Sequence, residues 1–489
     1  MIVVSKLLGY IREFFLVYLF GASVETDAYL LASVVPQLLF STIDLAFAAI
    51  LIPLLLELKK LDKTKLPGFV SVLTLCTTII LTVVTILGIF FSNSLLNMVA
   101  FGAESKVKEL AIILSQILMP MIILQGVIQI SIAVLRIYDK PVIGNFIGIP
   151  YNLIIMLGML AFKDSLGIYG VSIFVLIGVF AQMLVLLIYC MKLGMFGKFK
   201  FSDYKQILLR TLLLGVPTLY STFFSQIQVI VERLLASSLE TGTITIVYYI
   251  NKLFTLIVFI LITLINSLVF PKMGEWAITN DKKKYELKLN KLLRLFFLIL
   301  ILLTVITFIN SNELIKIILQ NGKLTSEDIR TIIIGFQLAV LGLSGYILKD
   351  ILTKVFFSYQ RVKIATNITV CSTIINAILS IILTNYYGVF GIIVSTPITT
   401  YLTVLISIYF IKTKLNIRIK LMGNKLLYLL VLGISTILIV GNGIIKMLTL
   451  NTYIILLINI FFTILVAISI YFYVRRRNLL NKKYFIKET

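Results

Sequence analysis

Apolar runs of about 20 residues recur along the whole chain, and they constrain its fold more than any other feature. A helix needs about 20 apolar residues to cross the roughly 30 Å hydrocarbon core of a bilayer. Fourteen stretches of the 489-residue chain meet this requirement. They lie near 2–21, 28–56, 69–91, 110–135, 142–162, 167–191, 208–237, 244–270, 292–309, 329–353, 364–384, 388–411, 425–445 and 452–474. We therefore predict an all-α polytopic membrane protein with about 14 transmembrane helices. Pro36 and Pro53 predict kinks in the second stretch, Pro217 predicts one in the seventh, and the long tenth stretch is predicted to be tilted or kinked.

Composition excludes several classes of function. Sixty per cent of the residues are hydrophobic, 13% are charged and none is histidine, whereas a soluble chain is about 25% charged. Water-soluble enzymes, nucleic-acid binding, imidazole metal sites and histidine-based triads are therefore excluded. The three cysteines lie in apolar runs, so we expect no disulfide and no metal cluster. The first run carries Lys6, Arg12 and Glu13 and is expected to be a retained span. The aromatic content predicts no stacking site.

The positive charges follow the loops and predict the topology. The formal net charge is +23, and 32 of the 44 cations fall in one set of loops and the C-terminal tail, while 7 fall in the opposite loops. Cytoplasmic loops carry the excess of lysine and arginine. Both termini are therefore expected in the cytoplasm, and the charge reflects topology rather than nucleic-acid binding.

An internal repeat divides the chain. Tyr138-Asp139-Lys140 is echoed by Tyr359-Gln360-Arg361, and Gly167-Ile168-Tyr169-Gly170 by Gly388-Val389-Phe390-Gly391, both 221 residues later. Six spans separate equivalent points, so both copies keep one orientation, as in transporters built from parallel repeats. We predict an N-terminal lobe over 1–206, a C-terminal lobe over 207–414, and a final helix pair with a basic tail over 415–489.

Nine charged residues fall inside the predicted spans at least three residues from either end, and a charge at the bilayer centre costs at least about 2.5 kcal/mol. They are Lys6, Arg12, Glu13, Asp44, Glu232, Arg233, Lys252, Lys349 and Asp350. Lys6 is close enough to a span end to reach the interface. The neighbours Glu232-Arg233 and Lys349-Asp350 are candidates for structural pairs. Arg12 and Lys252 are predicted to line a cavity that suits an anionic, phosphate-bearing ligand, because the guanidinium fork matches phosphate.

Several segments resemble the MurJ/MviN family of lipid II flippases, in the multidrug/oligosaccharidyl-lipid/polysaccharide (MOP) exporter superfamily. They are Ser5–Glu13, Phe20-Gly21-Ala22, Thr26–Tyr29, Pro36–Leu39, Gly215-Val216-Pro217, Glu232–Ser237, Tyr248–Leu253 and Gln320–Thr325. The resemblance implies two lobes around a cationic cavity for the diphosphate of an undecaprenyl-linked sugar. It implies substrate-binding roles for Arg12, Lys252, Lys6, Glu13 and Asp27. It also implies a sodium site that includes Glu232, Asn376 and Thr396, with Na⁺ as coupling ion and Ser380 where a longer polar side chain is usual.

Two departures from the family pattern leave the substrate open. The family's Pro-Asn-Leu-Leu-Arg reads Pro36-Gln37-Leu38-Leu39-Phe40 here, and Asp44 lies one position before an expected glutamate. The first hypothesis is a flippase, not an enzyme and without catalytic residues, that moves a polyprenyl-diphosphate-linked saccharide such as lipid II across the bacterial cytoplasmic membrane. The alternatives are a flippase for a capsule, O-antigen or teichoic-type lipid-linked glycan, and a transport-inactive scaffold that binds cell-envelope synthesis proteins. A cation-coupled drug exporter fits less well, because cationic drugs need acids.

Overall fold

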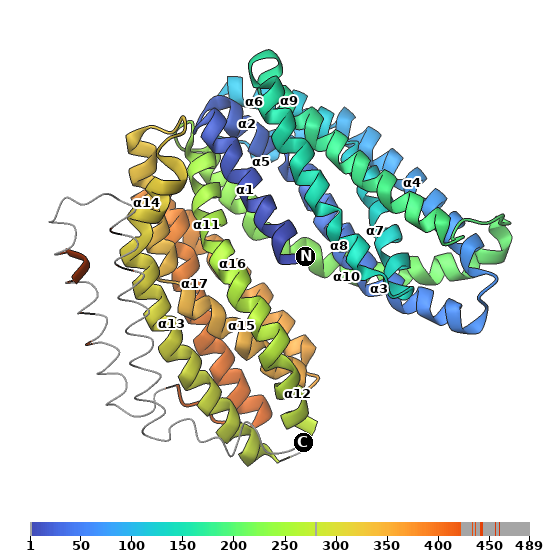
Figure 1. Ribbon diagram of the computed structural model, residues 1–489. Helices are drawn as coiled ribbons and strands as arrows, with labels where there is room; N and C mark the ends of the chain where they lie inside the picture. The colour runs from blue at the N-terminus through green and yellow to red at the C-terminus, as the bar shows by residue number, and fades with distance from the viewer. Residues whose placement is uncertain are drawn as a thin grey trace. The chain divides into compact units, whose positions relative to one another are not determined.

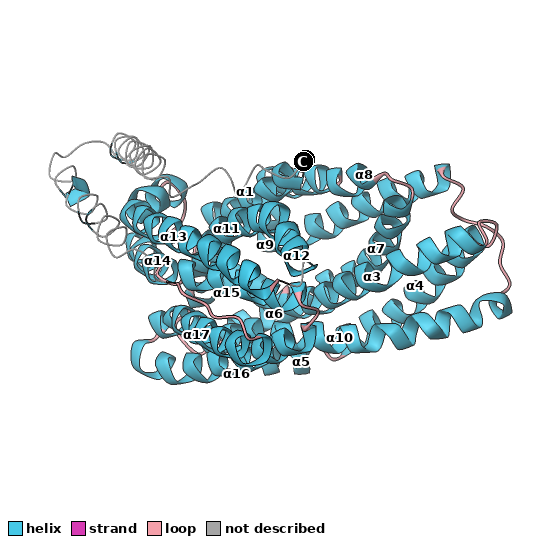
Figure 2. Cartoon of the chain, turned by 90° about the horizontal axis from the view of Figure 1, so that it is seen from below, coloured by secondary structure: helices cyan, strands magenta, loops and turns pink. Residues whose placement is uncertain are grey.

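The computed structural model describes residues 2–278 and 281–421, together with residues 433, 436, 441–443, 455 and 459. In these residues every regular element is a helix and no strand is present (Figure 2). This confirms the predicted all-α class. Nearly all of the predicted spans 425–445 and 452–474, and the basic tail, lie outside the described residues.

Figure 1 labels the α-helices and colours them in chain order from blue to red. The first ten are α1 (Ile2–Phe20), α2 (Val24–Ala32), α3 (Val34–Leu61), α4 (Leu66–Phe90), α5 (Ser92–Val99), α6 (Ser105–Leu118), α7 (Met121–Ile137), α8 (Pro141–Phe146), α9 (Gly148–Lys192) and α10 (Phe201–Ser237). The rest are α11 (Thr243–Leu264), the π-helical turn η1 (Ile265–Val269), α12 (Phe270–Ile278), α13 (Lys282–Leu319), α14 (Ser326–Val340), α15 (Leu343–Ser358), α16 (Val362–Tyr387), α17 (Val389–Phe410) and the π-helical turn η2 (Ile411–Leu415).

Seven helical stretches of the described chain are long and apolar enough to cross a membrane, or eight if α14 and α15 form one bent span. They are Leu66–Phe90, Ser105–Ile137, Val142–Lys192, Thr243–Ile278, Lys282–Leu319, Val362–Tyr387 and Val389–Leu415. The 51-residue stretch Val142–Lys192 turns back at Gly167 and holds two of the predicted spans. The number fourteen stays a prediction.

Two helix breaks follow from local chemistry. The predicted second span is divided at Ser33, between α2 and α3, because Pro36 has no N–H for the carbonyl four residues earlier and its ring clashes with that carbonyl. The predicted tenth span bends by 41° between α14 and α15. At that bend Gly342 lies so close to Pro397 that a Cβ on Gly342 would be 2.9 Å from the proline Cα. Pro53 lies inside α3 without ending it.

By its internal packing, the chain forms two compact units. The first comprises residues 1–249, 322–325 and 373–392, and the second comprises 250–321, 326–372 and the residues from Ile393 onward. In the first unit, α7 contacts α3, α4 and α9, and its buried face supplies the centre of an apolar core. Leu55, Phe69 and Val134 are completely buried there. The predicted lobes 1–206 and 207–414 follow the sequence repeat and stay a prediction.

In the second unit, side chains of the first turns of α13 form hydrogen bonds with the backbone of residues 418–420, which follow η2. The Asn290 side chain donates to the carbonyl of Arg418 at 2.8 Å and accepts from the amide of Lys420 at 2.6 Å. One turn earlier, Glu286 accepts from the amide of Arg418 at 2.9 Å. These side chains complete the hydrogen bonds of a segment that has no strand or helix partner of its own.

Each described residue with a left-handed backbone conformation has a left-handed counterpart in the other copy of the internal repeat. Eight described residues have positive φ, and they form four pairs: Gly21 with Gly242, Asp139 with Gln360, Gly167 with Gly388, and Gly194 with Asn416. The spacings are 221, 221, 221 and 222 residues. Asp139 and Gln360 also end their helices in the same way, with Lys140 N–H bonded to Leu135 O at 2.9 Å and Arg361 N–H bonded to Phe356 O at 2.8 Å. This is the Schellman closure, in which a left-handed residue follows the helix.

A glycine at these helix ends is expected to stabilise the protein. Gln360 has φ 56° and an exposed side chain, and a non-glycine residue in this region costs about 1 kcal/mol. Gln360→Gly should therefore raise the thermal unfolding temperature of the detergent-solubilised protein, while Gln360→Val should lower it. A glycine variant that is less stable than the parent would contradict this assignment.

Candidate functional site

Small residues bring α1 close to α9 and thereby position Arg12. A Cβ on Gly148 would lie 2.0 Å from Ser5 Oγ, and a Cβ on Gly9 would lie 3.8 Å from the Asn152 side chain. Asn152 is buried and donates to Gly148 O at 2.7 Å. Arg12 follows Gly9 by one turn, so its guanidinium lies over α9.

Arg12 and Glu13 form an ion pair that is largely withdrawn from solvent. Arg12 Nη2 contacts Glu13 Oε1, and the side chains are only 16% and 12% exposed. The Arg12 guanidinium also lies above the ring of Tyr151 on α9, 5.2 Å from its centroid. Two of the three predicted site residues on α1 are thus brought together, and the guanidinium keeps its charge beside a carboxylate and an aromatic face.

A second arginine lies on another tyrosine of the same unit. Arg233 of α10 is buried, its Cζ is 4.7 Å from the ring centroid of Tyr248, and its Nη1 donates to Ile244 O at 3.2 Å. The Tyr248 hydroxyl donates to Glu13 Oε2 at 2.8 Å. The aromatic content predicts no stacking site, and these contacts within the chain leave that a prediction. Aromatic residues are common in membrane helices, so only their three-dimensional neighbours distinguish these tyrosines.

Asp27 lies at the first turn of α2 and accepts hydrogen bonds from the start of α11. Its Oδ2 accepts from Gly242 N at 2.6 Å, and its Oδ1 accepts from Thr245 N at 2.8 Å and Thr245 Oγ1 at 2.5 Å. The side chain is 1% exposed. The carboxylate therefore caps the N-terminus of α11, where free N–H groups and the helix dipole favour negative charge. Its predicted substrate contact stays a prediction.

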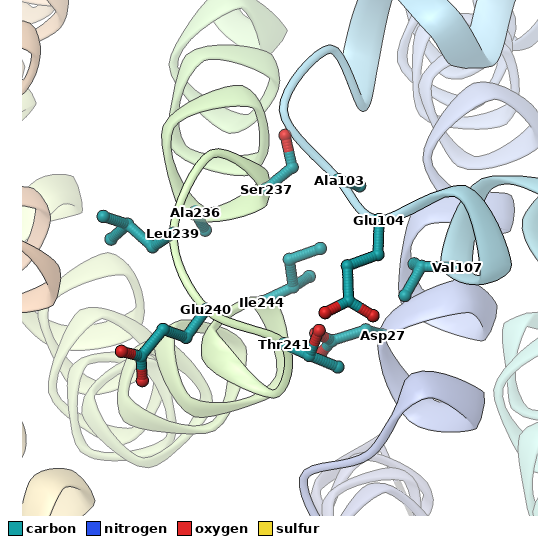
Figure 3. Close-up of a pocket in the computed structure, with 10 residues that line it drawn as sticks. All are labelled: Asp27, Ala103, Glu104, Val107, Ala236, Ser237, Leu239, Glu240, Thr241 and Ile244. Atoms are coloured by element: carbon teal, nitrogen blue, oxygen red, sulfur yellow. The ribbon is translucent and has the colours of Figure 1, made fainter.

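A small pocket borders this cap, as Figure 3 shows. Asp27 lines it together with Glu104 at the start of α6 and Thr241 in the loop before α11. In the close-up Glu104 points toward Asp27, whereas Glu240 points away. Among the described residues no group of three or more acidic, histidine or cysteine side chains is arranged to hold a metal ion. The pocket is therefore a feature of the cap rather than a metal centre.

In the second unit, the ion pair of α15 joins other residues than the predicted pair Lys349-Asp350. Lys349 and Asp350 are neighbours in sequence, but Asp350 forms its ion pair with Lys354, one turn later. Neighbouring residues on a helix point about 100° apart, while residues four apart share a face. Lys354, which we assigned to a loop, is buried at 6% exposure. Lys349 instead lies 5.5 Å from the ring centroid of Tyr346.

The other predicted residues are distributed over five helices. Lys252 is half-buried on α11 in the second unit, and Lys6 is exposed on α1 in the first. Of the predicted sodium ligands, Glu232 on α10 accepts from Gln228 Nε2 at 2.9 Å. Asn376 on α16 is 3% exposed, and Thr396 on α17 is half-buried. The side chains of Phe40 and Asp44 lie outside the described part of the chain.

Membrane-length helices, a twofold backbone repeat and paired charges at span depth define a polytopic membrane transporter. The chain belongs to the lipid II flippase MurJ family, whose model matches residues 16–471.

Individual relatives and solved structures agree with this assignment. The chain is 27% identical over 410 residues to the probable lipid II flippase MurJ of Buchnera aphidicola subsp. Schizaphis graminum, covering 82% of this chain and 79% of that protein. It is 24% identical over 434 residues to the one of Borreliella burgdorferi, covering 88% and 85%.

The fold is that of a solved lipid II flippase MurJ in an inward closed conformation, with a TM-score of 0.81, 23% identity and 98% coverage of both chains. An inward-facing multidrug resistance MATE transporter of the MOP superfamily shares the fold with a TM-score of 0.68 and 12% identity, over 84% of this chain and 94% of that one.

Removing the cap on α11 should destabilise the protein. Asp27→Ala leaves the Gly242 and Thr245 amides buried without their acceptor, at an expected cost of about 3 kcal/mol. The thermal unfolding temperature in detergent measures the loss. Glu25→Ala, an exposed acid on the same helix, is the matched control and should change it little. Equal stability of the two variants would show that the cap contributes nothing.

Proposed function

We propose that the protein translocates lipid II, a polyprenyl-diphosphate-linked saccharide, from the inner to the outer leaflet of the bacterial cytoplasmic membrane by alternating access. Membership of the lipid II flippase family and the fold support the proposal. The observation that carries it is the Arg12 guanidinium, largely withdrawn from solvent, paired with Glu13 and stacked on Tyr151. An arginine within an apolar run needs such partners, and its fork suits phosphate oxygens.

In this mechanism no covalent bond changes, so the residues act by binding and orientation, and none is assigned a catalytic role. Arg12 of the first unit contacts a phosphate of the diphosphate. The substrate contact of Lys252, which belongs to the second unit, stays what the family resemblance implies. The polyprenyl tail stays in the bilayer while the polar head crosses. Both termini face the cytoplasm, as the 32 loop and tail cations on one side support.

The proposal is tested by replacing the native flippase. A bacterium depleted of its own lipid II flippase should grow when it expresses this chain and fail when it expresses Arg12→Ala. Arg12→Lys keeps the charge without the fork and should rescue weakly. Lys106→Ala, at an exposed position on α6, should rescue fully. Growth supported by Arg12→Ala at normal membrane abundance would refute the role of Arg12. Failure of the native chain at normal abundance would favour another lipid-linked glycan or a scaffold role.

We also propose Na⁺ as the coupling ion, with Glu232 and Asn376 of the first unit as ligands. A carboxylate and an amide carbonyl supply oxygen ligands of the kind that hard cations prefer. Thr396 lies in the second unit and stays a ligand that the family resemblance implies. Flipping by proteoliposomes should therefore fall several-fold when Na⁺ is replaced by N-methyl-D-glucamine at constant ionic strength. Glu232→Gln should remove that difference. Equal rates in both ions would exclude sodium coupling.

A further inference from the structure

Glu13 is held between a guanidinium and a phenol hydroxyl of the first unit. Its Oε1 contacts the Arg12 guanidinium, and its Oε2 accepts the hydroxyl hydrogen of Tyr248 at 2.8 Å. The opposite contact of Tyr248 is Arg233, whose Cζ lies 4.7 Å from the ring centroid. The order Arg12, Glu13, Tyr248, Arg233 thus joins α1, α11 and α10 through side-chain contacts.

The Arg12–Glu13 pair occupies the guanidinium edge that a phosphate would use. A carboxylate and a phosphate oxygen make the same charge-assisted bonds to the guanidinium fork. An anionic ligand must therefore displace Glu13 from Arg12 before it gains these bonds. The displaced carboxylate, 12% exposed, needs another partner, because an unpaired charge in such surroundings is costly.

We propose that Glu13 is an internal competitor for the anionic substrate and that Tyr248 is the positioning residue that retains Glu13 once substrate has taken Arg12. The hydroxyl bond to Glu13 strengthens when the carboxylate is no longer shared with Arg12. Arg233, buried behind the phenol ring, stabilises the negative charge in that position. This inference rests on the proposed function, since it assumes a phosphate-bearing ligand at Arg12.

The exchange of Glu13 for substrate at Arg12 predicts whether each of two substitutions raises or lowers the affinity for the ligand. Only an interaction that differs between the free and bound states changes affinity. Tyr248→Phe weakens the bound state more than the free state, so affinity falls. Glu13→Gln removes the competing charge, so affinity rises. With glutamine at position 13 there is no charge for Tyr248 to hold, so Tyr248→Phe has no further effect.

The matched control is the neighbouring tyrosine. The Tyr249 hydroxyl donates to the main-chain carbonyl of Glu13 at 2.6 Å rather than to its carboxylate, and the side chain is completely buried. Tyr249→Phe removes the same atom one residue away. It should lower thermal stability without changing affinity.

The test measures binding of farnesyl diphosphate to the purified full-length protein in detergent by titration calorimetry, with thermal unfolding recorded for every variant. We expect about five-fold weaker binding for Tyr248→Phe, a change within two-fold for Tyr249→Phe, and about five-fold tighter binding for Glu13→Gln. The double variant Glu13→Gln/Tyr248→Phe should match Glu13→Gln.

Each other outcome has a distinct meaning. Unchanged affinity in Tyr248→Phe overturns the positioning role. An equal loss in the parent and in the Glu13→Gln background also overturns it, because Tyr248 would then contact the ligand directly or act through packing. A parent protein that binds no diphosphate refutes phosphate recognition itself, and with it the proposed function.

Discussion

The bilayer interior offers no water to solvate a charge, and this constraint governs every polar residue of the spans. Arg12 and Arg233 each lie on a tyrosine ring, and Asp350 is paired with Lys354. Removing one partner would leave the other charge unsolvated, which costs more than the pair contributes. Such contacts therefore favour burial of the faces of α1, α10 and α15 that carry these charges.

The overall class and the repeat were predictable from sequence because both depend on local patterns. Apolar runs alone predicted membrane helices, and the 221-residue echoes at Asp139/Gln360 and Gly167/Gly388 coincide with left-handed backbone in both copies. The pairs Gly21/Gly242 and Gly194/Asn416 were missed. Their flanking residues differ between copies, so backbone geometry shows the relation where side chains do not.

The partner of Asp350 was not predictable, because adjacent residues on a helix point about 100° apart while residues four apart share a face. Lys349-Asp350 was a candidate pair, yet Asp350 is bound to Lys354. Arg12 was singled out by its residue type and its place within an apolar run, and its role at the substrate stays a prediction. The role of Tyr248 requires three helices to meet, and no periodicity of one helix contains that information.

The turns at Gly167 and Gly388 have a consequence for biosynthesis. At each, one left-handed glycine reverses a helix directly into the next, with almost no loop between them. Such a hairpin carries little polar chain across the bilayer, and no long loop separates its two helices. Each hairpin is therefore suited to enter the membrane as one unit, late enough that both helices have left the ribosome.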